Sequence, residues 1–124
     1  MLPDINEILK LPDNWDNDGA RQVSENIGIR ANRLAVDLYQ MGYCLPREIL
    51  PTSEGTITLS WWAEGGMCDV EMGEAEYSVL VELYGPTPEN HIPFFGFKSS
   101  GSPHLGYIQA MLHLLGFKRG VNNS

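Results

Sequence analysis

Carboxylates are the most abundant side chains of this sequence that could take part in chemistry or recognition. The 124 residues include 16 Asp and Glu but only eight Lys and Arg, which gives a formal net charge of −8. Nine of the acids lie from Glu48 to Glu89, and no basic residue stands between Arg47 and Lys98. Direct binding to nucleic acid is disfavoured, because it depends on Lys and Arg neutralising phosphates. Two interpretations stay open: the charge keeps the protein dispersed, or it meets a basic partner.

A second group of oxygen ligands lies in the loop after Pro12. Counted from position 14, this loop nearly matches the EF-hand calcium pattern, with Gly19 at position 6. An uncharged residue at position 1 and Arg21 at position 8 count against calcium, and Pro12 interrupts the helix that should enter the loop. We expect at most weak calcium affinity, and no cofactor. The candidate ligands are Asn14, Asp16, Asp18 and Glu25.

Histidine and cysteine do not form a recognisable catalytic or metal-binding set. Cys44 and Cys68 form no C-x-x-C motif, and we expect both to be reduced thiols. No nucleophile elbow or phosphate loop is present. The sequence therefore favours a protein that is not an enzyme. The histidines lack the spacing of a zinc site, and they are His91, His104 and His113.

Three segments have the apolar spacing of helices that would position these groups. The longest, 24–41, has Ser24 as its N-cap, an apolar stripe at helical spacing, and Gly42 after its end. A short helix is expected over 3–11. A last helix is expected over 103–115, with Ser102 as its N-cap and Pro at its first position.

The middle of the chain alternates with the period of β-strands. Strands are expected at about 56–62, 67–72 and 77–84, and their short connections require an antiparallel meander. Segment 45–51 reads as an extended connector, and 91–97 is a fourth strand if Pro93 lies at a sheet edge. We expect an α+β domain with three to four strands packed against helices 24–41 and 103–115. It is a single domain over 1–124, divided into an N-terminal helix and loop (1–23), a core (24–119) and a tail (120–124).

Two motifs together resemble a known group of proteins. Trp15-Asp16-Asn17-Asp18-Gly19-Ala20 precedes helix 24–41, and residues 51–61, P-T-S-E-G-T-I-T-L-S-W, open the first strand. This is similar to small bacterial proteins with a W-D-G-x-G-A loop, a helix and a P-T-x-x-G-x-I-x-L-x-W strand, although Asn17 replaces the usual Gly. The likeness covers about residues 11–72. It implies the order of the elements and a bacterial or bacteriophage origin, and no activity.

The strand pattern and the charge together suggest a binding surface. Asp69, Glu71 and Glu82 fall on the sheet face opposite the apolar series. Trp62 points away from its neighbour Trp61 and so joins these acids. We expect a non-enzymatic module that binds a basic protein surface, for example a phage or mobile-element inhibitor of a nucleic-acid-binding enzyme. A small ligand-binding or hydrolytic domain with a pocket between helix 24–41 and the sheet is the second candidate.

The remaining expectations concern assembly and location. The N-terminus has neither the basic nor the apolar region of a signal peptide, and no apolar run approaches the length of a membrane span. We therefore expect a cytoplasmic protein that contacts no membrane. It should be a monomer or a small homo-oligomer, the latter through pairing of the edge segment 91–97.

Overall fold

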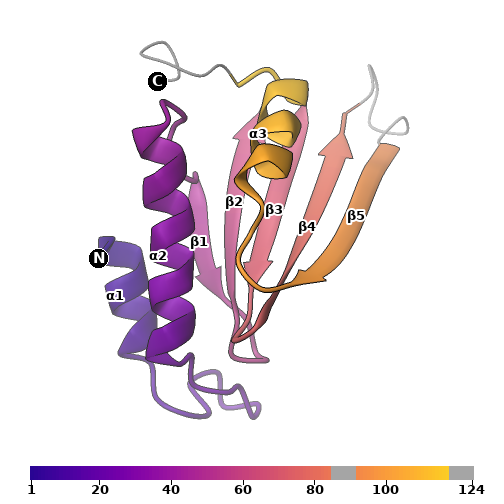
Figure 1. Ribbon diagram of the computed structural model, residues 1–124. Coiled ribbons are helices and arrows are strands. Elements are labelled where there is room, and N and C mark those ends of the chain that lie inside the picture. The colour runs from indigo at the N-terminus through magenta and orange to yellow at the C-terminus, as the bar shows by residue number, and fades with distance from the viewer. Residues whose placement is uncertain (85–91, 118–124) are drawn as a thin grey trace.

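An antiparallel sheet with helices against one side forms the structure, a computed structural model that describes residues 1–84 and 92–117, without the side chains of 92–95 (Figure 1). The five strands lie in the order of the chain, β1-β2-β3-β4-β5. In sequence order the elements are α1 (Pro3–Leu9), α2 (Glu25–Gln40), β1 (Glu48–Pro51), β2 (Ile57–Ala63), β3 (Gly66–Met72), β4 (Glu76–Leu83), β5 (Ile92–Ser100) and α3 (Leu105–Leu114).

The expected α+β class is confirmed, but the sheet has five strands instead of three to four. The additional strand is β1, which lies in the segment expected to be a connector. It pairs with β2 at the sheet edge, where Ile49 lies opposite Leu59, and an edge strand tolerates the proline at its end. The fourth expected strand is present as β5 and extends to Ser100. The expected loop at 86–90, His91 and the tail at 120–124 lie outside the described residues.

Helix α2 begins and ends as its sequence predicts. The Ser24 hydroxyl accepts a hydrogen bond from the backbone N–H of Ile27, which satisfies one of the free donors of the first turn. At the other end Gly42 has φ +98°, and the N–H groups of Gly42 and Tyr43 donate to the carbonyls of Tyr39 and Leu38. This is a Schellman motif, and it closes the helix without a side-chain cap.

The beginning of α3 differs from the expectation. Its N-cap is His104, whose Nδ1 accepts a hydrogen bond from the Tyr107 N–H, and Ser102 lies in the connection before it. Gly101 turns the chain with φ +80°, and Pro103 follows before the first helical turn can form. The end of α3 was expected at Gly116, and a second Schellman motif closes the helix there, with Gly116 at φ +97°.

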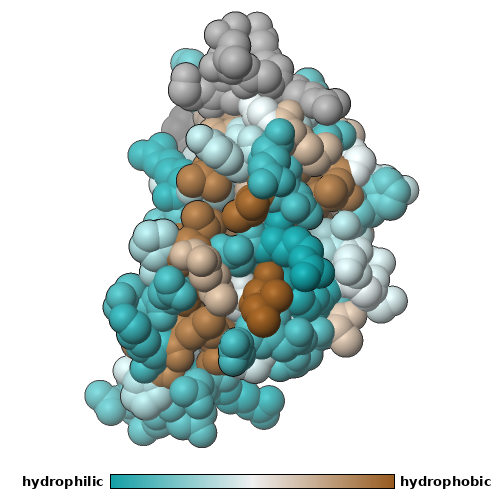
Figure 2. Space-filling model, turned by 60° about the vertical axis from the view of Figure 1, so that its left-hand side comes forward, coloured by the Kyte–Doolittle hydropathy of each residue, from teal (hydrophilic) through white to brown (hydrophobic). Residues whose placement is uncertain are grey.

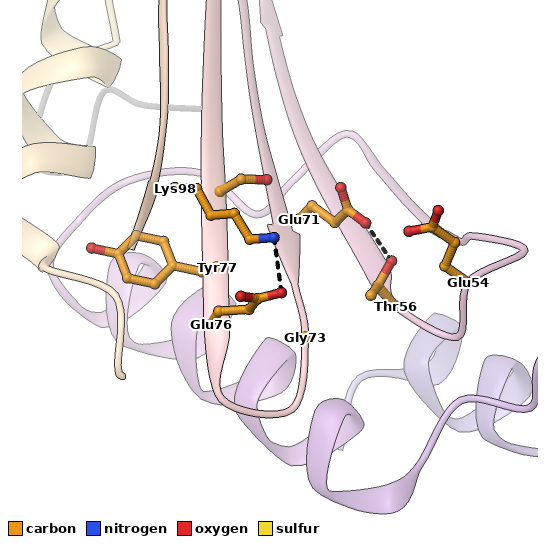
Figure 3. A pocket seen from close by; sticks show the side chains of 8 residues that line it. Glu54, Thr56, Glu71, Gly73, Glu76, Tyr77 and Lys98 are labelled. Carbon is orange, nitrogen blue, oxygen red and sulfur yellow. Dashed lines mark hydrogen bonds and ion pairs between the residues drawn. The ribbon is translucent and has the colours of Figure 1, made fainter. Parts of the chain in front are cut away.

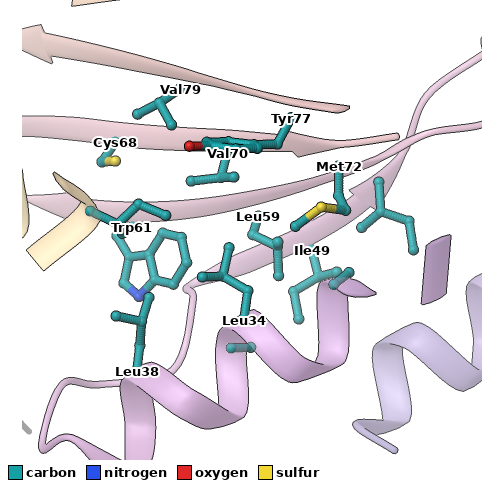
Figure 4. Close-up of a cluster of buried hydrophobic side chains, with 14 of the residues drawn as sticks. Leu34, Leu38, Ile49, Leu59, Trp61, Cys68, Val70, Met72, Tyr77 and Val79 are labelled. Atoms are coloured by element: carbon teal, nitrogen blue, oxygen red, sulfur yellow. The ribbon is translucent and has the colours of Figure 1, made fainter. Parts of the chain in front are cut away.

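One hydrophobic core lies between the helices and a single face of the sheet. Figure 4 shows Leu34 and Leu38 of α2 directed at Leu59 and Trp61 of β2. Trp61 is fully buried and its Nε1 donates to the Cys44 carbonyl at 3.1 Å. Burying this ring and satisfying its N–H together stabilise the fold by about 3 kcal/mol. Alternate residues of β2, β3 and β4 supply the sheet side of the core, in agreement with the predicted period.

The helices leave the opposite face of the sheet uncovered. Buried residues of α1, α2 and α3 all join the same core cluster, and the sheet residues in that cluster all belong to one face (Figure 1). Seen from the side that carries α1, hydrophobic surface occurs only in narrow stretches broken by hydrophilic side chains (Figure 2). In the described part of the chain, no helix covers the second sheet face.

Candidate interaction surface on the open sheet face

We call the uncovered sheet surface the open face, and its residues form rows across β2, β3, β4 and β5. The strand register fixes these rows, since opposed residues of antiparallel strands point to the same side. The first row holds Thr58, Glu71, Ser78 and Lys98; the second holds Ser60, Asp69, Leu80 and Gly96; the third holds Trp62, Met67 and Glu82.

The register places the three predicted acids on this one face. Asp69 and Glu71 are neighbours on β3, whereas Glu82 stands in the third row on β4. Trp62 also lies on this face and is 40% exposed, and none of the described helices covers it. Trp62 and the three acids therefore share one sheet face, as the strand pattern predicted. The acids are spread over three rows, however, and are not packed into one cluster.

Asp69 occupies the middle of the open face. It lies between Ser60, which is only 6% exposed, and Leu80, which is 44% exposed. One carboxylate oxygen, Oδ1, is shielded from solvent and accepts no hydrogen bond within the described part of the chain. Shielding a carboxylate oxygen from water without a donor costs free energy.

Arg47 contacts the open face although the sequence placed it outside the acidic stretch. Its guanidinium lies over the ring of Trp62, 4.9 Å from the ring centroid. Its backbone N–H donates to the Ser60 carbonyl, and this hydrogen bond holds the Arg47 backbone beside β2. Trp62 thus holds a guanidinium by a cation–π contact and still exposes part of its ring.

A hollow lined by carboxylates lies at the end of the open face where the β1–β2 and β3–β4 turns meet (Figure 3). It has a volume of about 250 Å³. Thr56 Oγ1 donates to Glu71 at 2.6 Å, and Lys98 forms a 3.0 Å ion pair with Glu76. Glu54 adds a third carboxylate from the β1–β2 turn. We call this the carboxylate hollow, and its charge suits an ammonium or guanidinium group.

The calcium candidate loop uses its oxygens within the loop itself. Asn14 Oδ1 accepts from the Gly19 N–H at 2.7 Å, and Asp16 Oδ1 accepts from the N–H groups of Asp18 and Ala20. These backbone hydrogen bonds lower the pKa of Asp16. Glu25 stands in the first turn of α2. These contacts make the segment a well-formed turn, in which Gly19 takes φ +84°.

Within the described residues, the two thiols, His104 and His113 show no arrangement for nucleophilic catalysis. Both cysteines are free, as expected, and burial raises the pKa of Cys68 to about 12, with the Asp69 charge adding to the effect. Burial also raises the pKa of Cys44, so neither sulfur is an activated thiolate. His104 caps α3, and His113 packs edge-on against Tyr43 at 5.6 Å.

Neither a known family nor a metal site is identified for the described residues. Comparison of the chain with family models, curated proteins and solved structures found no match. Over residues 1–84 and 92–117, no three His, Cys, Asp or Glu side chains gather closely enough to hold a metal ion. No described helix combines the length and apolar character needed to cross a bilayer.

Proposed function

We propose that this protein is a non-enzymatic binding module that docks its open face on a basic protein surface. The single observation that carries the proposal is the exposure of Trp62 and Leu80 on a sheet face that also presents Asp69, Glu71 and Glu82. Exposed aromatic and aliphatic anchors ringed by charge are typical of protein interfaces.

The contacts on this face fit arginine and lysine in particular. The guanidinium of Arg47 lies over the Trp62 ring, and this contact supports the proposal that the ring accepts an arginine of a partner. The carboxylate hollow offers Glu54, Glu71 and Glu76 to a second cationic side chain. Complementary charge of this kind raises the rate of association and sets the orientation of the partner.

One specific form of this function is inhibition of a nucleic-acid-binding enzyme. Carboxylates on the open face would take the place of phosphates in the enzyme's basic groove, and the resemblance of the 15–20 and 51–61 motifs would place such an inhibitor in a bacterium or phage. The support for this form is the charge of the open face, and the surface can be tested without knowing the partner.

The test compares two variants that lose the same charge from different surfaces. The first, Asp69→Asn, Glu71→Gln and Glu82→Gln, neutralises the open face with side chains of equal size. The matched control, Asp4→Asn, Asp18→Asn and Glu25→Gln, removes three charges from α1, the following loop and α2. The probe is a fluorescently labelled arginine–serine repeat peptide, and its anisotropy reports binding.

We expect the open-face variant to bind the peptide about tenfold more weakly, since each of the three lost contacts at a solvated surface contributes about 0.5 kcal/mol. The control variant should change affinity by less than about threefold, and binding should weaken with added salt. Equal losses in both variants would mean that net charge alone attracts the peptide, and the proposed surface would be wrong.

A further inference from the structure

A second hollow, a cavity of about 590 Å³, lies beside the connection between β5 and α3. Figure 1 shows the course of this connection from the end of β5 to the start of α3. Four rings from different elements line the cavity: Tyr77 of β4, Phe97 of β5, His104 of the connection and Tyr107 of α3. We call it the ring-lined hollow. Its volume lies within the range of sites for small molecules, about 300–1,000 Å³.

The rings form a continuous aromatic wall. Phe97 contacts Tyr77 edge-on at 6.1 Å between centroids and Tyr107 at 5.7 Å, and Tyr107 contacts His104 at 5.1 Å. Tyr77 is almost fully buried and its hydroxyl accepts from the His104 N–H, so it forms the floor. Tyr107 is 57% exposed and leaves much of its ring available. Because these rings meet edge-on or tilted, a planar ligand can stack on one of them at a time, and the exposed ring of Tyr107 offers such a face.

The polar groups of the hollow favour negative charge. None of the described residues that line it is acidic, in a chain whose formal net charge is −8. Lys98 borders it at the edge strand β5; its side chain leaves the strand on the open face, where its ion pair with Glu76 is more than half exposed and therefore weak. His104 Nδ1 accepts from the Tyr107 N–H, so the neutral ring carries its proton on Nε2, which is a donor. Ser102 adds a hydroxyl.

From this combination we propose that the ring-lined hollow binds a small planar aromatic anion, such as an aryl carboxylate. The aromatic wall supplies the stacking surface, and Lys98, His104 and Ser102 supply donors for the anionic group. This site lies beside β5 and α3, and its ligand class is opposite in charge to the basic partner of the open face. Lys98 borders both sites, so only the ring substitutions Tyr107→Ala and His104→Asn test the ring-lined hollow separately from the open face.

The test titrates 2-naphthoate into the ¹⁵N-labelled protein and follows the backbone amide shifts. We expect saturable shifts in residues 97–107. Tyr107→Ala should weaken binding about tenfold, while Tyr39→Ala, an equally exposed tyrosine on α2, should leave it unchanged. His104→Asn keeps an acceptor for the helix cap but removes the ring, and it should weaken binding several-fold at unchanged stability.

The charge of the ligand is tested with matched pairs. Lys98→Met should weaken naphthoate binding several-fold, whereas Lys10→Met, which breaks a comparable exposed ion pair on α1, should not. A naphthylmethylammonium ion of similar size should bind more weakly than naphthoate. The proposal is overturned if the cation binds equally well, if Tyr107→Ala behaves like Tyr39→Ala, or if no amide of 97–107 shifts up to about 10 mM naphthoate.

Discussion

Arg30 joins three parts of the fold that are far apart in sequence, and its replacement gives the sharpest test of the architecture. From the middle of α2, its guanidinium donates to the carbonyl of Gly73 in the β3–β4 turn and to that of Gly101 after β5. The Gly101 N–H in turn donates to the Ala75 carbonyl at 2.8 Å. One side chain thus holds the β3–β4 turn, the end of β5 and the approach to α3 on the same helix.

Arg30→Met keeps the apolar stem but removes both donors. A hydrogen bond to a charged group contributes about 1.5–3 kcal/mol, and the half-buried position of Arg30 places each bond near the lower end. We therefore expect a loss of about 2–3 kcal/mol in the free energy of unfolding. That is a large part of the stability of a domain of this size, which is about 5–15 kcal/mol.

The assay is urea unfolding followed by the fluorescence of the buried Trp61, with hydrogen exchange of the Gly101 amide as a local readout. Arg33→Met is the matched control, since Arg33 lies on the exposed side of the same helix. The midpoint should fall clearly for Arg30→Met and hardly for Arg33→Met. Equal effects within about 0.5 kcal/mol would refute the anchoring role of Arg30.

Three further predictions concern the turns. Hydrogen bonds from Ser24 and Asn26, with the charge of Arg30, lower the pKa of Glu74. The ionised Glu74 therefore stabilises the fold above its unfolded pKa of about 4.3, and this stabilisation is lost as the pH falls through the lower folded pKa. Glu74→Gln should reduce the loss of stability below about pH 4.3 in urea titrations, compared with Glu64→Gln as control. Gly66→Ala should lower the free energy of unfolding by at least about 3 kcal/mol, because a Cβ there would lie 2.2 Å from the Glu82 carbonyl oxygen. Gly65→Ala should lower it little, since a Cβ at that position meets nothing closer than 3.9 Å. Similar melting temperatures for the two variants would contradict this packing. Calcium up to about 1 mM should leave the fluorescence of Trp15 unchanged, and a saturable change would show that the loop binds the ion.

Local patterns predicted the elements whose signals lie within a few residues. Helix α2 has its cap at Ser24 and its closing glycine at Gly42, and both work as expected. The alternation in β2, β3 and β4 separates core from open face, which is why Asp69 and Glu71 could be assigned to one side. These signals depend on the helical and pleated periods of the backbone and need no long-range contact.

The features that sequence reasoning missed all depend on tertiary pairing. Strand β1 is short and exists because it pairs with β2. His104 replaces Ser102 as the cap of α3, because the turn at Gly101, whose N–H donates to the Ala75 carbonyl, delays the helix. Arg47 and Lys98 bound the acidic stretch in the sequence, but the sheet brings both to the open face, where they contact Trp62 and Glu76. No local pattern predicts these pairings, so the carboxylate hollow was not foreseen.

The most direct measurement of the central claim is an amide-shift map of the labelled protein with the arginine–serine peptide. We expect shifts at Trp62, including its indole N–H, and at Asp69 and Leu80 on the open face, with little change along α2. We also expect these shifts to become much smaller when Asp69, Glu71 and Glu82 are neutralised together. Shifts concentrated on α1 and α2, or a map unchanged by that neutralisation, would contradict the open face as the binding surface.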